Sequence, residues 1–214
     1  MESSRAGRCS PYEFIPFAEK NNLIVELGRE LLEEGLKKLR DWQQLPQCRN
    51  LTLSINLVAD QIYEEGFAES LIKRIRELGI DPSLLMFEFT ESTLIYNLEL
   101  ARVNIEKLNK IGVNFAIDDF GTGYSSLTYL SQLPWHQLKI DQSFVRNIGV
   151  ESKDEAIIRT IISMAQSLGL EVIAEGVETA SQKAFLLQHG CTHYQGYLFG
   201  YPVPASQFET ERCA

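Results

Sequence analysis

The sequence predicts an α/β fold built as a TIM-type barrel, with about six of its eight strands present. Two observations predict this fold class. Six β-type runs alternate with helical segments, and a polar residue stands at the end of every run. The length of 214 residues is short for a complete barrel, which typically needs about 250. We therefore expect an incomplete barrel whose missing strands would precede Pro11.

The composition indicates a globular protein. Apolar residues make up 44% of the chain and charged residues 23%, which is ordinary for a folded domain. A net charge of −9 without any basic run argues against a DNA-binding surface. No apolar run approaches the roughly 20 residues of a membrane helix. The four cysteines have no metal-ligand spacing and follow no signal peptide, so we expect reduced thiols in a cytoplasmic protein.

The first half of the chain alternates between helix and strand. Proline near a helix start is favourable, and glycines stand where the helices are expected to end. In order, the expected elements are a helical segment from Pro11 to about Leu36, a strand at 51–57, a helix ending before Gly79, a strand at 85–90 and a helix at 97–111 closed by Gly112.

The stretch 114–127 is the centre of this arrangement. Its apolar run ends in the adjacent carboxylates Asp118 and Asp119, and a turn bracketed by glycines leads into a helix that Ser125 can cap. Two such carboxylates repel each other in a low-dielectric site unless a proton or a cation neutralises them. A divalent metal ion is the most direct way to keep both carboxylates ionised. In isolation, Asp118 would simply cap the turn and Asp119 would face water.

The second half continues the alternation. The expected elements are a strand at 137–140, a helix at 154–168 closed by Gly169, a strand at 171–174, a helix at 180–189, a strand at 194–199 and a short helix opened by Pro204.

Each predicted strand ends in a polar side chain, which suits a closed barrel better than an open sheet with a single switch point. These strand-end residues are Asn56, Glu88, Asp118 with Asp119, Lys139 with Asp141, Glu175 and Gln195. The side-chain oxygens of five of these residues suit Mg²⁺ or Mn²⁺, namely those of Asn56, Glu88, Asp118, Asp119 and Glu175. Lys139 could anchor a phosphate or orient an attacking water, and two such ions about 4 Å apart commonly hydrolyse phosphodiesters. Singly, each could be a strand-end hydrogen-bonding group, a salt bridge or a solvated charge. Their shared position favours a site.

The motifs that carry these residues resemble those of the EAL-domain family. They are Phe14-Ile15-Pro16-Phe17-Ala18-Glu19 after Pro11, Ser54-Ile55-Asn56-Leu57, Glu88-Phe89-Thr90-Glu91, Asp118-Asp119-Phe120-Gly121-Thr122-Gly123-Tyr124-Ser125-Ser126-Leu127, Leu138-Lys139-Ile140-Asp141, Ala174-Glu175-Gly176-Val177-Glu178-Thr179 and Gln195-Gly196-Tyr197. The resemblance implies a metal-dependent phosphodiesterase that opens cyclic di-GMP to linear pGpG on a modified TIM barrel.

The resemblance also implies roles for individual residues. Asn56, Glu88 and Asp118 would hold one Mg²⁺ or Mn²⁺ ion, and Asp118 with Asp119 the second. Lys139 would position the attacking water and Glu175 would support the metal cluster. Glu91 would hold the loop from Asp119 to Tyr124, near the family's dimer interface. Gln195 and Asp141 would lie at the ligand. A homodimer, and a sensor or GGDEF-type domain in a parent protein, are the implied partners, with no DNA or membrane.

Two departures from the family pattern lead to further expectations. The family's Glu-Ala-Leu segment should lie just before Gly7, where only Glu2 and Arg5 offer a faint match, and Val58 replaces a common serine. We expect 1–10 to be a non-matching stub and 11–214 to be a truncated EAL domain lacking one metal ligand. Activity is then expected to be impaired. A non-catalytic cyclic di-GMP-binding or protein-interaction module remains the alternative, and a poorly folding fragment is a third. Unpaired edge strands would favour oligomers.

Overall fold

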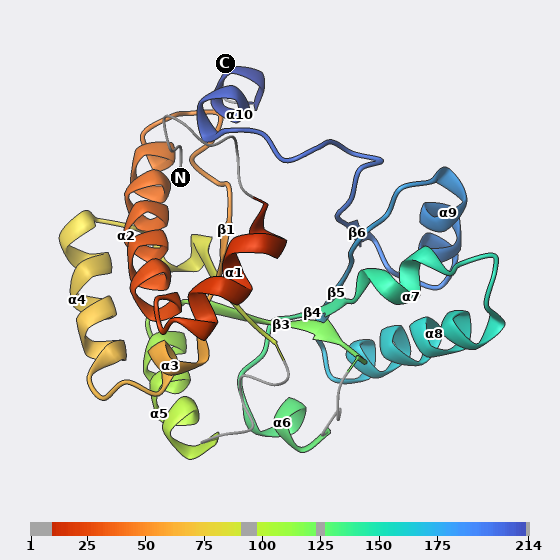
Figure 1. The fold of residues 1–214 in the computed structure, drawn as a ribbon, viewed down its shortest axis with the longest axis horizontal. Coiled ribbons are helices and arrows are strands. Elements are labelled where there is room, and N and C mark those ends of the chain that lie inside the picture. Colours follow the sequence, from red (N-terminus) through yellow and green to blue (C-terminus); the bar gives the residue numbers. More distant parts are fainter. Residues whose placement is uncertain (1–9, 91–97, 123–126, 213–214) are drawn as a thin grey trace.

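The computed structural model describes residues 10–90, 98–122 and 127–212 (Figure 1). One sheet of six parallel strands, in the order of the sequence, curls into half of a barrel and confirms the predicted fold class. The strands are β1 (Leu53–Asn56), β2 (Leu85–Thr90), β3 (Asn114–Phe120), β4 (Gln137–Ile140), β5 (Glu171–Ala174) and β6 (His193–Tyr194). Parallel pairing requires crossover connections, and helices supply them here.

Helices flank the sheet on both sides in Figure 1, with α2 to α5 on one side and α7 to α9 on the other. Helix α2 packs on β1, and α8 packs on β4 and β5. The helices are α1 (Pro11–Lys20), α2 (Ile24–Gln43), α3 (Ala59–Ile62), α4 (Phe67–Leu78), α5 (Leu98–Asn109), α6 (Leu127–Gln132), α7 (Gln142–Arg146), α8 (Ser152–Ser167), α9 (Ala180–Gln188) and α10 (Ala205–Arg212), with a 3₁₀ turn η1 (Pro82–Leu84).

The central strands are buried on both faces, as expected for a parallel sheet covered by helices. In β2 every residue except Thr90 is buried, and in β3 only Asn114 and Asp119 are partly exposed. The rings of Phe89 and Phe115 stack with their centroids 6.1 Å apart. This aromatic core fixes β2 against β3, the two strands that carry most of the acidic residues.

Two predicted helices are each divided in the structure. The helical pattern that begins at Pro11 breaks between α1 and α2, where Asn22 has a positive φ of 56° and Asn21 Nδ2 donates to the carbonyl of Phe17 at 2.7 Å. The segment after β1 breaks between α3 and α4 at Gly66, whose φ is 79°. Asparagine and glycine adopt the left-handed conformation most easily. Asn22 lies just after the C-cap of α1, and Gly66 is the N-cap of α4.

The expectation of a long last strand at 194–199 is wrong, because β6 contains only His193 and Tyr194. After β6 the chain turns around Val177, which donates its N–H to the carbonyl of Gln195 at 3.0 Å and accepts from Leu198 at 3.0 Å. A Cβ at Gly196 would lie 2.3 Å from the backbone N and O of Val177. Close packing against this backbone replaces strand pairing.

The chain's last helix returns to its first long helix. Helix α10 lies against the end of α2 (Figure 1), where Lys38 pairs with Glu209 at 3.0 Å. The rings of Trp42 and Phe208 lie 5.5 Å apart. Strands β1 and β6 stay at the two edges of the described sheet, so helix packing rather than strand pairing connects the arms of the half-barrel.

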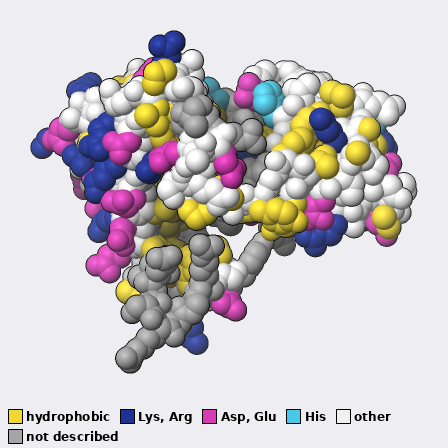
Figure 2. Space-filling view, turned by 90° about the horizontal axis from the view of Figure 1, so that it is seen from above, with side chains coloured by type: hydrophobic (Ala, Val, Ile, Leu, Met, Phe, Trp, Pro, Cys, Tyr) yellow, Lys and Arg dark blue, Asp and Glu magenta, His cyan; other side chains and the backbone are white. Residues whose placement is uncertain are grey.

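The surface differs between the two sides of the molecule (Figure 2). Charged side chains of both signs gather over the side of α2 and α4, where Arg74 pairs with Glu33 and Lys107 with Glu69. Hydrophobic side chains appear on the side of α9 and β6. In the segment that follows β6, Tyr197 is 54% exposed.

One expectation about the cysteines is corrected by the structure. Cys48 is buried and disulfide-bonded, so the prediction of four reduced thiols is wrong at this position. Cys191 is a buried free thiol.

No helix within the described ranges combines the length and the apolar character needed to cross a membrane. Some of the predictions concern residues outside the described ranges. These are the roles of Ser125 and Glu91, the match at Glu2 and Arg5, and nearly all of the stub 1–10.

Candidate metal centre

The carboxyl ends of the strands bring the predicted acidic residues together. Asn56 on β1 is in register with Glu88 on β2, and Thr90 is in register with Asp118 on β3. Since side chains alternate along a strand, Glu88, Thr90 and Asp118 project from the same face of the sheet. The sequence pattern predicted this convergence, which places buried charge where barrel folds carry their chemistry.

Lys139 on β4 lies at the centre of three of these carboxylates. Its Nζ is 2.7 Å from Glu88 Oε2, 3.1 Å from Asp118 Oδ1 and 2.7 Å from Glu175 Oε1. Burial disfavours the charged ammonium, but Glu88, Glu175 and Asp118 outweigh this effect and raise the pKa of Lys139. Lys139 therefore carries its proton in this site.

Asp118, Asp119 and Glu175 form a set suited to a cation. One carboxylate oxygen from each lies within 4.8 Å of the other two, and Asp118 is buried. Carboxylate oxygens are the ligands that Mg²⁺ and Mn²⁺ prefer. The strand-end pattern predicted Glu175 as an oxygen ligand suited to a metal, and the family resemblance implied a supporting role for it at the cluster. Its position directly after β5 was the available signal.

The backbone at Asp119 has a left-handed conformation next to a register shift in the sheet. Its φ of 54° lies in the left-handed region, and the pairing of β3 with β4 shifts register between Ile117 and Phe120. Both features are typical of functional sites, where strain is held by surrounding structure. The Asp119 N–H donates to Asp118 Oδ1 at 2.9 Å, which holds the Asp118 carboxylate. Oxygens of both adjacent carboxylates lie within 4.8 Å of a Glu175 oxygen.

The charge balance shows that this site holds excess negative charge. Burial, together with the neighbouring charges of Asp118 and Asp141, raises the pKa of Asp119 to about 6. Burial also raises the pKa of Glu175, with Lys139 opposing that shift. In the described structure, the carboxyl groups of Glu88, Asp118, Asp119 and Glu175 thus lie around Lys139, and Asp141 faces Asp119. A divalent cation would relieve the repulsion among them.

Asp141 has a structural contact in addition to its predicted place at the ligand. It is the N-cap of α7, where its Oδ1 accepts from the backbone N–H of Ser143 at 2.9 Å and from the Ser143 hydroxyl. Its carboxyl group also faces Asp119. The side chains of Asn56 and Gln195 are exposed, and for Gln195 the contacts are through its backbone. The ligand roles of these three residues stay predictions.

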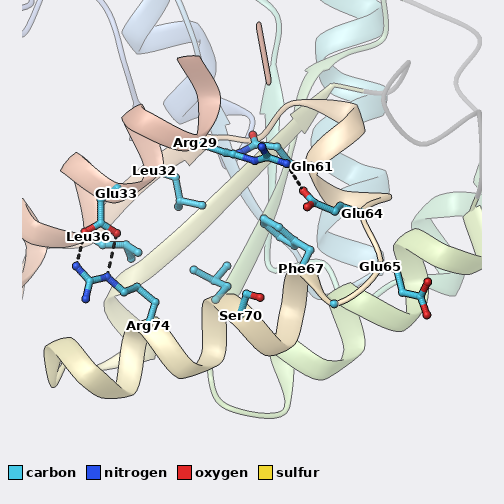
Figure 3. Close-up of a pocket in the computed structure, with 12 residues that line it drawn as sticks. Arg29, Leu32, Glu33, Leu36, Gln61, Glu64, Glu65, Phe67, Ser70 and Arg74 are labelled. Atoms are coloured by element: carbon cyan, nitrogen blue, oxygen red, sulfur yellow. Dashed lines mark hydrogen bonds and ion pairs between the residues drawn. The ribbon is translucent and has the colours of Figure 1, made fainter. Parts of the chain in front are cut away.

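A separate hollow of about 240 Å³ lies between α2 and α4, and none of its lining residues belongs to the acidic group (Figure 3). Figure 3 shows Arg29 reaching Glu64, with the two side chains 2.8 Å apart, and Arg74 facing Glu33. Both pairs cross from α2 to the α3–α4 segment. The buried Gln61 lies against α2, and its Oε1 accepts from the N–H of Val58 at 3.1 Å. We interpret this hollow as a packing seam between helices.

Comparisons with known proteins agree with this fold and site. The family model for the EAL domain matches residues 1–202. The chain is 39% identical over 206 residues to the bifunctional diguanylate cyclase/cyclic di-GMP phosphodiesterase MucR of Pseudomonas aeruginosa, covering 96% of the chain and 30% of MucR. It is 38% identical over 208 residues to the cyclic di-GMP phosphodiesterase PdeR of Escherichia coli, covering 97% and 31%. The chain thus spans less than a third of the length of these relatives.

Solved structures show the same architecture. The MucR phosphodiesterase in complex with c-di-GMP superposes with a TM-score of 0.90 at 39% identity, covering 97% of this chain and 83% of that one. The manganese/cy-diGMP complex of Klebsiella pneumoniae BlrP1 gives a TM-score of 0.74 at 28% identity, covering 83% and 45%. With a family match over 1–202, a shared half-barrel and acidic residues at its strand ends, this chain belongs to the EAL-domain family.

Proposed function

We propose that this chain binds cyclic di-GMP and hydrolyses it to linear pGpG with two divalent cations. The observation that carries the proposal is the convergence of Glu88, Asp118 and Glu175 on Lys139, with Asp119 beside them, at the strand ends of an EAL-family half-barrel. Relatives named as cyclic di-GMP phosphodiesterases, and a relative solved as a c-di-GMP complex, support this ligand.

The residues of the site have distinct proposed roles. Asn56, Glu88 and Asp118 would hold one ion, and Asp118 with Asp119 the other. Glu175 would contribute an oxygen beside Asp118, since both belong to the group within 4.8 Å. When bound, Mg²⁺ or Mn²⁺ would polarise the phosphate and lower the pKa of a bound water. A manganese complex of a related structure supports the choice of ion.

Lys139 and Glu91 keep the roles that the resemblance implies, and Gln195 and Asp141 stay proposed ligand contacts. Lys139 would orient the attacking water from its position between Glu88 and Glu175. Asp141 also fixes α7 beside the site. The domain proposed for this activity is 11–214, with 1–10 as a stub.

Turnover is expected to be slow, below the roughly 1 s⁻¹ of an ordinary enzyme. The support is the sheet of the described residues, in which β1 and β6 are the two outer strands and do not pair with each other. The same observation supports the second candidate, a module that binds cyclic di-GMP without hydrolysing it.

Free edges of the described sheet also support the proposed homodimer, because unpaired N–H and C=O groups can pair with a strand of another chain. We also propose a cytoplasmic location. The expectation of four reduced thiols no longer supports it, because Cys48 is disulfide-bonded.

Calorimetry and product chromatography with Mn²⁺ and cyclic di-GMP test the proposal. We expect Mn²⁺-dependent binding and slow pGpG formation, both lost in Asp118→Asn because that carboxylate serves both ions. Asp41→Asn, an exposed position on α2, is the matched control and should behave as the wild type. Binding without product would favour the non-catalytic module. Absence of Mn²⁺ binding, or the same binding in Asp118→Asn, would overturn the proposal.

A further inference from the structure

Lys139 occupies the same carboxylates that the proposed metal centre requires. Its ammonium contacts Asp118 and Glu175, two of the three residues whose oxygens lie within 4.8 Å of one another. Its third contact, Glu88, is a proposed ligand as well. Two cations that share oxygens at such distances repel each other, and each carboxylate lone pair can serve only one of them.

Among the described residues, Lys139 is the cation that pairs with these carboxylates. In the described part of the chain, every ion pair of Glu88, Asp118 and Glu175 within 4.0 Å is made with Lys139. The Lys139 side chain is only 5% exposed, and the side chains of its partners are 8%, 12% and 16% exposed. Buried charges of one sign are unfavourable without a counterion. Without Lys139, these three carboxylates would have no ion-pair partner within the described ranges of the chain.

We infer that Lys139 is the internal counterion of the metal centre. Its ammonium stabilises the folded, metal-free chain and competes with divalent cations for the oxygens of Glu88, Asp118 and Glu175. Metal binding therefore requires the ammonium to withdraw from these carboxylates. The inference rests on the proposed metal centre and adds to it a device that weakens metal affinity while making folding independent of metal.

Strand geometry allows this exchange. Lys139 is the third of four residues of β4, with its backbone fixed by pairing to Ile173 of β5, so only the side chain needs to move. Lysine has four rotatable side-chain bonds and a compact charge, which lets the ammonium shift without moving the strand. The shifted ammonium would face the phosphate or the water, which links this role to the proposed orientation of the nucleophile.

The first test compares Mn²⁺ affinity in the wild type and in Lys139→Met by calorimetry at pH 8. We expect Lys139→Met to bind Mn²⁺ about tenfold or more tightly, because both the competition and the repulsion are removed. Lys139→Arg keeps the charge and should stay within a few-fold of the wild type. Lys183→Met removes an exposed positive charge above the Tyr194 and Phe199 rings and should change the affinity less than twofold.

The second measurement is thermal unfolding with a chelator and with saturating Mn²⁺. In chelator, Lys139→Met should melt well below the wild type, and Mn²⁺ should raise its melting temperature more than that of the wild type. Equal or weaker Mn²⁺ binding by Lys139→Met, with binding by the wild type intact, would overturn the inference and leave the proposed function standing. Lack of Mn²⁺ binding by both proteins would instead remove the proposed function.

A third measurement follows the metal titration in the wild type, and a variant is used only to assign the signal. The ammonium ¹⁵N resonance of Lys139, assigned by its loss in Lys139→Arg, is followed during titration with diamagnetic Mg²⁺. We expect it to shift, and its protons to exchange faster with water, as the site fills. A resonance that stays unchanged at saturation would show that the ammonium keeps its carboxylate contacts, and the inference would fail.

Discussion

The indole Nε1 of Trp42 donates a hydrogen bond of 2.8 Å to Oε1 of Glu209, which lies 167 residues further along the chain. The same oxygen accepts from Lys38 at 3.0 Å, and the ring of Phe208 packs on Trp42. These contacts join α10 to α2 and so connect the two ends of the half-barrel. Helix α10 is too short to be stable alone, since isolated helices below about 12 residues are marginal in water.

Removing the aromatic contact should therefore release α10. We expect Phe208→Ala to lower the free energy of unfolding by about 1–2 kcal/mol, because a partly buried ring and its aromatic partner are lost. Hydrogen exchange should accelerate across α10 before it does so in the core. Ser206→Ala, at an exposed position of the same helix, is the control. Unchanged exchange in Phe208→Ala would show that α10 is held by other contacts.

Acidification should weaken the fold through His136. Its Nδ1 accepts from the backbone N–H of Phe115 at 3.1 Å, which only the unprotonated nitrogen can do. Burial lowers the pKa of His136, while the nearby Glu171 opposes this. The unfolded chain therefore binds the proton more readily. The contribution of His136 to stability is complete above its ordinary pKa of about 6.5 and is lost as the pH falls below that value.

Urea unfolding at pH 7.5 and pH 5.5 measures this effect. The wild type should lose more stability on acidification than His136→Asn, whose Oδ1 can still accept from Phe115 but does not titrate. The difference in stability loss between the two proteins isolates the contribution of His136 from that of Asp119. The raised pKa of Asp119 acts in the opposite direction, because acidification then favours the folded chain. The control His193→Asn changes an exposed ring. Parallel pH profiles for the wild type and His136→Asn would contradict the prediction.

Gly28 should not tolerate alanine, although alanine is usually the better helix former by about 1 kcal/mol. A Cβ there would lie 2.7 Å from Gln61 Oε1 and 3.0 Å from Val58 Cγ2. Gln61 is fully buried and its Oε1 is held by Val58, so it has little room to move. We expect Gly28→Ala to destabilise the chain by about 1–3 kcal/mol, as overpacking does.

A double-mutant cycle with Gln61→Ala identifies the cause. If the Gln61 amide is the obstacle, Gly28→Ala should cost much less in the Gln61→Ala background than in the wild type. Glu30→Ala, exposed on the same helix, controls for a general effect of substitution in α2. Strictly additive energies would place the source of the destabilisation elsewhere.

Gly196 and Gly200 offer a matched pair, because their φ values are 156° and 157°. A Cβ at Gly196 would lie 2.3 Å from the backbone of Val177, whereas at Gly200 nothing lies within 4 Å. Both alanine variants meet nearly the same φ, so their difference in stability reports the contact with Val177. We expect Gly196→Ala to be less stable than Gly200→Ala by at least about 1–3 kcal/mol. Equal melting temperatures would mean that the segment after β6 moves away without cost.

Local pattern was sufficient to predict much of the fold. Strands β2, β4 and β5 have the predicted boundaries, since apolar runs and helix-ending glycines are local signals. The rule that strand ends carry polar residues also predicted the group around Asp118, including Glu175 on a separate strand. Long-range contacts decided the elements that the pattern missed. The end of β6, for example, depends on Val177, which the periodicity of 194–199 does not reveal.

The sequence by itself determined the fold class, the family and the identity of the acidic residues, because these depend on the order and type of residues along the chain. Tertiary structure alone decided which oxygens meet. The contacts of Lys139 with Glu88 and Glu175 join three strands, and their distances depend on how the sheet curls. The raised pKa of Asp119 likewise depends on burial and on charges brought close by folding. Electrostatic interactions follow distance in space and local dielectric, which spacing along the chain does not specify.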